Sequence, residues 1–377
     1  MKYLDEYRDG ATARIMAEAI RAEADTGRTY RLMEFCGGHT HAIFRYGIQD
    51  LVPDNLCFVH GPGCPVCVLP AGRIEAAIRL AEGEDVILCT YADLMRVPAG
   101  KKDSLHKAKA RGADIRMIYS ATDALGIAQA NPDRQVVFFA IGFETTTPPT
   151  AAVLKIARAM QLNNFSVYCN HVQTPPAMAH ILDSGEAQID GILGPSHVST
   201  IIGSRAYADC SGRYAMPIVI AGFEPLDVLA STLMLLRQIN QGRHAVENQY
   251  MRVVSETGNQ KAQALMDETF EPRALFEWRG LGVLPNSAVQ IRDGYSQFDA
   301  EKRFAMQGVD VAENKGCICP AVLRGVSRPD ECRLFGTACT PEDPKGACMV
   351  SSEGACAAWY SYGRRSASAG TAMEARS

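Results

Sequence analysis

The sequence predicts an α/β protein with two related parallel-sheet, Rossmann-like domains and a third, mostly irregular or helical region. Two observations predict this fold class. Short apolar runs alternate with longer helix-like segments over most of the chain, which is the pattern of parallel βα units. After about residue 245 the alternation fades, Pro and Gly recur, and six of the thirteen cysteines lie between Cys317 and Cys356.

The apolar runs predict two series of strands. The first series lies at residues 30–35, 55–60, 86–90, 115–119 and 136–141. The second lies at residues 165–170, 191–193 and 217–221. The clearest helices, with apolar residues at three- and four-residue spacing, lie at residues 73–82, 151–160 and 227–240.

Two pairs of similar segments indicate that the α/β halves are related. Ala140-Ile-Gly-Phe-Glu144 resembles Ile220-Ala-Gly-Phe-Glu224, and Gly61-Pro-Gly-Cys64 faintly resembles Gly194-Pro-Ser-His197. The predicted division is a first α/β domain at 1–142, a second at 143–244, a cysteine-rich region at 245–363 and a disordered tail at 364–377. The tail is expected to be disordered because its small, polar residues show no apolar periodicity.

Composition argues against several classes of protein. The net charge is -4 and no stripe of Lys or Arg stands out, which argues against a nucleic-acid partner. No apolar stretch approaches the roughly 18 residues that a membrane-spanning helix needs. Residues 1–10 hold three acidic side chains instead of a basic start and an apolar run, so no secretion signal is expected. The expected compartment is the cytoplasm.

The thirteen cysteines are the unusual feature of the composition. An odd number in a chain expected in the cytoplasm does not fit a disulfide framework, because cytosolic thiols are kept reduced. Metal binding or thiol chemistry fits better. Cys89 and Cys169 lie inside apolar, strand-like runs and are best explained as buried small hydrophobic residues.

Cys36 lies in a glycine-rich turn, Phe35-Cys-Gly-Gly-His-Thr-His41, that follows the first expected strand. The second expected strand runs into Gly61-Pro-Gly-Cys-Pro-Val-Cys67. Ligands of open parallel sheets collect outside the carboxyl ends of the strands, so neighbouring strands would bring these cysteines to one edge. His39 is a further candidate for catalysis, although a histidine there can equally cap a helix or satisfy a backbone group.

Cys64 and Cys67 form a CxxC motif, and this spacing has two chemical uses. Two thiolates can bind one metal ion, or two thiols can form and break a disulfide. Pro65 between them resembles the redox pairs of thioredoxin-like folds, where a stiff turn before a helix lowers the pKa of a thiol. The spacing alone leaves both uses open, and two thiols without chemistry in a tight turn are the third alternative.

The third region contains four widely spaced cysteines and two further thiols. The four are Cys319, Cys332, Cys339 and Cys356, separated by 12, 6 and 16 residues, and the further thiols are Cys317 and Cys348. Four thiolates from loops can hold a cubane iron–sulfur cluster or a zinc ion. Structural zinc usually takes two CxxC-like pairs, which are absent here. The irregular spacing therefore favours a cluster over zinc, and disulfides are the weakest alternative.

Five segments of the chain resemble the signature segments of the HypD family of hydrogenase maturation factors. They are Leu32-Met-Glu-Phe-Cys-Gly-Gly-His-Thr-His-Ala-Ile-Phe44, His60-Gly-Pro-Gly-Cys-Pro-Val-Cys-Val-Leu-Pro70, Gly142-Phe-Glu-Thr-Thr-Thr-Pro148, Ala221-Gly-Phe-Glu-Pro-Leu-Asp227 and Ser351-Ser-Glu-Gly-Ala-Cys-Ala-Ala-Trp-Tyr360. They occur in one order, and the resemblance extends from the first residues to about Gly363. The extended tail beyond that residue is the main departure, and it holds no candidate site residue.

The resemblance implies an assembly scaffold with redox activity, which builds the Fe(CN)2CO group of nickel–iron hydrogenases. It implies a complex with the small chaperone HypC, cyanide supplied by HypE as a thiocyanate, and passage of the iron towards the hydrogenase large subunit. By position, Cys36 would ligate the mononuclear iron together with a chaperone cysteine. Cys64 and Cys67 would take part in iron binding and thiol redox chemistry. The resemblance also implies a 4Fe-4S cluster on Cys319, Cys332, Cys339 and Cys356.

We hypothesise that this cluster keeps Cys64 and Cys67 reduced or feeds electrons directly to the iron. Two other functions stay open at this level. One is an iron–sulfur thiol–disulfide or ferredoxin-linked reductase that binds no mononuclear iron, and the other is a zinc-stabilised interaction protein. The sequence holds no GxxxxGK[ST] phosphate loop, so an ATP-driven step would take place on another protein.

Overall fold

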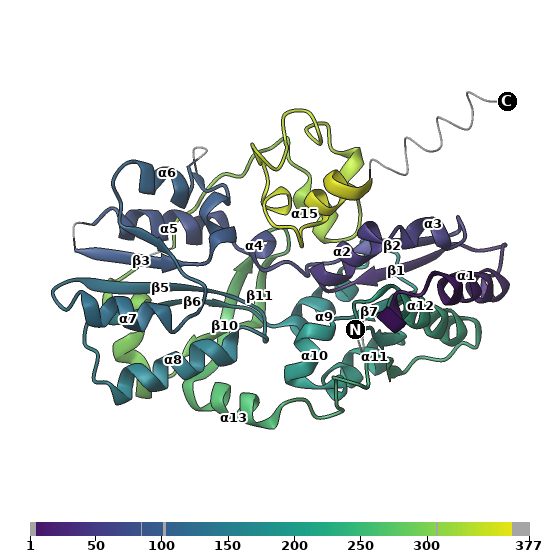
Figure 1. Ribbon diagram of the computed structural model, residues 1–377, viewed down its shortest axis with the longest axis horizontal. Coiled ribbons are helices and arrows are strands. Elements are labelled where there is room, and N and C mark those ends of the chain that lie inside the picture. The colour runs from purple at the N-terminus through teal and green to yellow at the C-terminus, as the bar shows by residue number, and fades with distance from the viewer. Residues whose placement is uncertain (1–4, 84, 101–102, 307, 364–377) are drawn as a thin grey trace.

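The computed structural model describes residues 5–83, 85–100, 103–306 and 308–363. Two parallel sheets with flanking helices make up its core, which confirms the predicted α/β class (Figure 1). The five-stranded sheet has the order β2 (Leu56–His60), β1 (Tyr30–Glu34), β7 (Gly191–Gly194), β8 (Ile218–Ile220) and β9 (Val246–Asn248). The four-stranded sheet has the order β4 (Ile115–Met117), β3 (Val86–Thr90), β5 (Gln135–Gly142) and β6 (Phe165–His171).

The chain does not complete one sheet before it starts the other. It forms β1 and β2 of the five-stranded sheet, crosses to the four-stranded sheet for β3 to β6, and returns for β7 to β9. The predicted division at residue 142 therefore falls inside the four-stranded sheet, between β5 and β6. Each expected strand is present, but apolar periodicity does not tell which strands pair, so the exchange between sheets was not predicted.

The helices on the sheet faces follow the expected βα rhythm. They are α1 (Gly10–Glu23), α2 (Gly37–Arg45), α3 (Ile48–Leu51), α4 (Pro65–Val68), α5 (Ala71–Ala81), α6 (Leu105–Ala110), α7 (Asp123–Ala130), α8 (Thr147–Ala159), α9 (Thr174–Ser184), α10 (Ser196–Ile202), α11 (Ala208–Tyr214), α12 (Pro225–Asn240) and α13 (Gln260–Thr269). α8 begins before the expected residue 151, because Pro148 and Pro149 fit the first turn of a helix, where no backbone N–H is needed.

An antiparallel hairpin lies in the region that was expected to be irregular or helical. It consists of β10 (Phe270–Trp278) and β11 (Gly282–Ile291), with a shift in register between Arg273 and Leu275. β11 packs against β6 and α9 and so extends the core of the four-stranded half. Pro272 and Pro285 interrupt the apolar alternation by which strands are recognised, which explains why the hairpin was not predicted.

Beyond the hairpin the chain forms short helices and turns, among them α14 (Ala300–Arg303), α15 (Cys319–Leu323), α16 (Ala355–Ala358) and η8 (Trp359–Gly363). The yellow part of this region, from α15 onward, lies above α4 in Figure 1, between the two sheets. On one side Arg96 donates to the carbonyl oxygens of Pro341 at 2.8 Å and Val350 at 3.4 Å. The predicted disordered tail at 364–377 lies outside the described residues.

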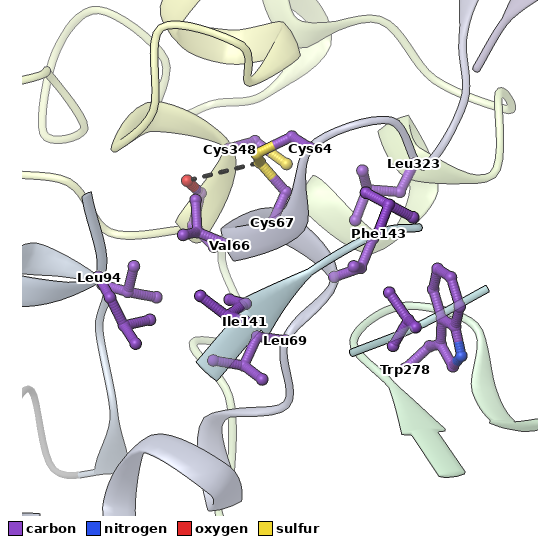
Figure 2. Close-up of a cluster of buried hydrophobic side chains, with 14 of the residues drawn as sticks. Cys64, Val66, Cys67, Leu69, Leu94, Ile141, Phe143, Trp278, Leu323 and Cys348 are labelled. Atoms are coloured by element: carbon purple, nitrogen blue, oxygen red, sulfur yellow. Dashed lines mark hydrogen bonds between the residues drawn. A yellow bond between two sulfur atoms is a disulfide. The ribbon is translucent and has the colours of Figure 1, made fainter. Parts of the chain in front are cut away.

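The CxxC motif is part of the core where these three parts meet. Cys67 is buried in one apolar cluster with Ile141 of β5, Trp278 of β10, and Leu323 and Cys348 of the third region (Figure 2). Segments that are far apart in the sequence therefore enclose the motif. No helix in the described part of the chain combines the length and the apolar character that a bilayer crossing requires.

Candidate functional site

Two parallel strands deliver the two predicted cysteine turns to the same edge of the five-stranded sheet. β1 and β2 pair with Glu34 opposite His60, so both turns begin at the same level. The Gly61 N–H donates to the Glu34 carbonyl oxygen at 2.9 Å, and the Gly37 N–H donates to the Gly63 carbonyl oxygen at 3.3 Å. The two turns therefore lie against each other, as the strand order suggested.

Gly63 permits this close approach of the two turns. A Cβ atom at this position would lie 2.7 Å from the Cα and N atoms of Cys36. Because a side chain cannot occupy that space, the turn needs a glycine there. Cys64, the next residue, is thereby held beside the Cys36 turn.

Cys36 sits at the N-terminus of α2, with its thiol almost completely buried. Its backbone N–H donates to the Glu34 carboxylate at 3.1 Å. Burial, and next to it the negative charge of Glu353, raise the pKa of the Cys36 thiol to about 12. The thiol is therefore protonated at neutral pH, and an incoming cation or base is needed to make it a thiolate ligand.

His197 is a site residue that the sequence analysis did not select. It follows β7, which pairs with β1 on the side opposite β2, and its Nδ1 lies 3.7 Å from the Cys36 sulfur. Burial lowers the pKa of His197, so the imidazole is a neutral group beside the thiol. The similarity between Gly194-Pro-Ser-His197 and Gly61-Pro-Gly-Cys64 was the one sequence signal that could have found it, since the two segments follow the strands on either side of β1.

Cys64 and Cys67 form a disulfide across the single turn of α4. Both sulfur atoms are buried, and the Cys67 sulfur lies 3.9 Å from the Ala347 carbonyl oxygen (Figure 2). In this oxidised form neither sulfur is a thiolate that can bind a metal. The sequence left metal binding and redox chemistry open, and the disulfide favours the redox use.

His39 lies completely buried behind the Cys36 turn. Its Nε2 is 2.9 Å from the Ala221 carbonyl oxygen, which can only accept, so this nitrogen carries the proton. Burial lowers the pKa of His39 to about 4 and keeps the ring neutral. This contact holds α2 against the end of β8, which supports the alternative that His39 satisfies a backbone group. A catalytic role of His39 stays a prediction.

The thiols of the third region gather in a group beside α4. Cys319 contacts both Cys317 and Cys348, and Cys348 also contacts Cys356. Gly346 lines this group, since a Cβ atom added to it would lie 2.4 Å from the Cys317 sulfur.

Backbone N–H groups also point at the sulfur atoms of the third region. The Lys345 N–H donates to the Cys339 sulfur at 3.3 Å. Buried thiols that accept such hydrogen bonds suit an iron–sulfur cluster. Cys319 and Cys356 belong to the thiol group, and Cys339 lies beside it. Three of the four predicted cluster ligands are therefore close together.

Cys332, the fourth predicted cluster ligand, is partly exposed, and its sulfur lies 3.9 Å from the Gly316 carbonyl oxygen. Within the described ranges, no three or more His, Cys, Asp or Glu side chains are arranged around a common metal position. The donors therefore fit a cluster in chemistry and burial, but the predicted set of four is not preassembled. Cys348, which the spacing left as a spare thiol, lies beside the Cys64–Cys67 disulfide (Figure 2).

Comparison with known proteins agrees with these motifs. The family model HypD, described as hydrogenase formation hypA family, matches residues 11–363. Hydrogenase maturation factor HypD of Azotobacter vinelandii is 62% identical over 370 residues, which cover 97% of this chain and 98% of that protein. The protein of the same name from Escherichia coli is 47% identical over 367 residues, which cover 96% and 98%. The chain therefore belongs to the HypD family.

Proposed function

We propose that this chain is a hydrogenase maturation scaffold, on which a mononuclear iron ion receives cyanide and carbon monoxide. Its relatives are named hydrogenase maturation factors, which supports this assignment. The iron is cargo: the chain holds it transiently with a HypC-type chaperone, and it passes indirectly to a hydrogenase large subunit. The proposed compartment is the cytoplasm.

The observation that carries the proposal is the convergence of Cys36, the CxxC motif and His197 at one sheet edge, directly in front of the buried thiol group. Iron with cyanide and carbon monoxide ligands prefers soft thiolate donors. Cys36 would supply one donor and a cysteine of the chaperone another. His197 is placed to take the proton that Cys36 loses when the metal binds.

A HypE-type partner would deliver cyanide as a protein thiocyanate, R–S–C≡N. Release of cyanide breaks the sulfur–carbon bond and requires two electrons and a proton on the sulfur. A dithiol supplies these: R–S–CN and two thiols give R–SH, HCN and one disulfide. The Cys64–Cys67 disulfide is the oxidised product of this step, so each cyanide oxidises the pair once and two cyanides need two cycles.

The oxidised pair must be reduced between cycles, and a cluster in the third region would supply electrons for this. Cys319, Cys339 and Cys356 would hold it together with Cys332, which must turn from Gly316 towards the others. The Cys67 sulfur already contacts the backbone at Ala347, next to the thiol group. The distance that electrons have to cross is therefore short.

A second function is favoured by the disulfide alone. The chain would be an iron–sulfur thiol–disulfide oxidoreductase that never binds mononuclear iron, with the same CxxC pair as its active site. The two functions differ in one observable property, since only the scaffold carries iron with diatomic ligands.

Infrared spectroscopy on the chain purified anaerobically with its chaperone tests this difference. We expect stretching bands of bound cyanide and carbon monoxide in the wild-type complex and their loss in Cys36→Ser. Cys57→Ser is the matched control, because Cys57 is an exposed thiol of β2 outside the site, and its bands should persist. Bands that survive in Cys36→Ser would contradict the assignment of Cys36, and a wild-type complex without bands would favour the oxidoreductase.

Metal analysis and Cys332→Ser test the cluster separately. We expect about four irons per chain beyond the cargo, whereas a zinc module would hold about one zinc. Cys332→Ser should lose the visible absorption of the cluster and should stop maturation. Normal maturation by a cluster-free variant would disprove the electron relay.

A further inference from the structure

A buried carboxylate lies beneath the Cys36 turn. The Glu34 side chain accepts hydrogen bonds from the Cys36 backbone N–H at 3.1 Å, from the Thr40 hydroxyl, and from His60 Nδ1 at 2.9 Å. The Glu34 side chain is almost completely buried, so these donors take the place of water. Cys36 and Thr40 belong to the turn and to α2, and His60 ends β2. Glu34 therefore ties together the backbone on both sides of the cysteine.

The protons of His60 can be assigned from its two partners. The Trp359 indole N–H lies 2.8 Å from His60 Nε2, and an indole nitrogen can only donate. Nε2 must therefore accept, and the single proton of the neutral ring is on Nδ1, which donates to Glu34. The result is a directed chain from Trp359 through His60 to Glu34, and from there to the backbone of Cys36.

Trp359 belongs to the segment that carries the last cysteine. Its backbone N–H donates to the carbonyl oxygens of Ala355 and Cys356, so a helical turn connects it to Cys356. The indole also packs on Phe44 of α2, with ring centroids 5.0 Å apart. In the same segment, Glu353 lies so close to the Cys36 turn that a Cβ atom at Gly37 would be 2.4 Å from the Glu353 Cβ. The segment thus covers the turn that presents Cys36.

We propose that His60 and Trp359 are positioning residues, which lock the Cys36 turn only while the segment after Cys356 is seated on α2. The inference rests on the proposed function in one respect, because it assumes that Cys36 is the reactive thiol. It adds a mechanical link between the thiol group of the third region and the proposed iron site. A displacement of Cys356 moves Trp359 and breaks the hydrogen bond from its indole to His60. The hydrogen bond between Glu34 and the Cys36 backbone then becomes looser.

Alkylation of Cys36 by iodoacetamide, followed by mass spectrometry on the full anaerobic chain across a range of pH, measures the lock without iron or partners. Trp359→Phe removes the indole donor, and His60→Leu removes both polar atoms of the ring. We expect each to raise the alkylation rate of Cys36 by about tenfold, which is the effect of losing one buried hydrogen bond to a charged network. His60→Gln keeps one donor and one acceptor and should stay within about twofold of the wild type.

Two controls separate the lock from a general loss of structure. Trp278→Phe removes the other indole N–H, which donates to Ser287 at 2.9 Å and has no part in the hydrogen bonds between His60, Glu34 and Cys36, so it should leave the Cys36 rate unchanged. Cys169, buried in β6, should stay unreactive in every variant and so reports on folding within the same sample. Equal Cys36 rates in Trp359→Phe and Trp278→Phe would overturn the proposal, and so would a His60→Gln variant as reactive as His60→Leu.

A double-mutant cycle tests the link to Cys356. Cys356→Ser should also raise the Cys36 rate, and adding Trp359→Phe to it should increase the rate by less than about twofold more, since both changes release the same segment. Fully multiplicative effects would show that the two residues act independently and would refute the coupling. Because this readout needs no diatomic ligands, absent infrared bands would count against the proposed function while leaving the lock intact.

Discussion

Three histidines near the Cys36 turn illustrate how partners decide what a side chain does. His39 donates to a backbone carbonyl in the core, His60 joins a carboxylate to an indole, and His197 faces the Cys36 thiol. All three follow or lie near strand ends in the sequence. The atoms around each ring suit His39 to a structural role, His60 to the proposed positioning role and His197 to the proposed role of proton acceptor.

The buried carboxyl group of Glu144 gives a test on a single side chain. It accepts hydrogen bonds from the backbone N–H of Thr174 at 2.7 Å and from its hydroxyl at 3.0 Å. Burial raises the pKa of Glu144 from 4.5 to about 7. Between these values the folded protein keeps a proton that the unfolded chain loses, so stability falls as pH rises through this window.

The expected loss is about 3 kcal/mol of unfolding free energy between pH 4.5 and pH 7, from roughly 1.4 kcal/mol per pKa unit. Glu144→Gln has no such proton and should lack this part of the pH dependence. Urea unfolding of both proteins across this pH range measures the difference between their unfolding free energies. The contributions of the other titrating groups are the same in both proteins and cancel in this difference. Parallel pH profiles of wild type and variant would refute the assignment.

At the scale of elements, the site depends on how closely two turns approach. The Cys36 turn and the CxxC turn share a backbone hydrogen bond and leave no space for a side chain between them. Backbone contacts therefore fix how the two turns lie against each other. A substitution that separates the turns should therefore affect the proposed iron site more than the fold.

Gly63→Ala is this substitution. Its Cβ atom would lie 2.7 Å from Cys36 Cα, and we expect a loss of stability of about 1–3 kcal/mol from overpacking. The infrared bands of the bound iron should disappear although the protein stays folded. Gly126→Ala is the matched control: a Cβ atom added to this glycine of α7 would meet no neighbouring side chain within 4 Å, and alanine should stabilise the helix by about 0.5–1 kcal/mol. Unchanged bands in Gly63→Ala would contradict the close approach.

For the whole molecule, the exchange of strands between the sheets has a direct consequence. β1 pairs with β7, and β5 pairs with β6, so both sheets need strands from either side of residue 142. The third region then closes over the junction and buries the CxxC motif (Figures 1 and 2). The molecule should therefore fold as one cooperative assembly of these parts.

A fragment of residues 1–142 tests this cooperativity. It would leave one hydrogen-bonding edge of β1 and of β5 unpaired, and we expect no cooperative transition in urea by circular dichroism. Co-expression with a fragment of residues 143–377 supplies β6 and β7 and should restore a transition like that of the full chain. Cooperative unfolding of the isolated fragment would contradict the interdependence of the sheets.

The meeting of the two cysteine turns was predicted from the sequence, because both turns lie at strand ends. Apolar runs located β1 and β2, and the geometry of parallel sheets then required Cys36 and the CxxC motif to meet. His197 was not predicted, because no periodicity says that β7 is the other neighbour of β1. The hydrogen bond between His60 and Trp359 joins residues 299 positions apart, and no local pattern encodes such a contact.

Local periodicity and motifs of fixed spacing were enough to predict the α/β class, strands β1 to β8, the two cysteine turns and the family. The folded chain was needed to see which strands share a sheet, and to see that Cys317 and Cys348 join the thiol group while Cys332 faces Gly316. It was also needed to see that the segment after Cys356 covers Cys36. Local patterns do not encode these features, because strand pairing and packing depend on surfaces that distant parts of the chain form together.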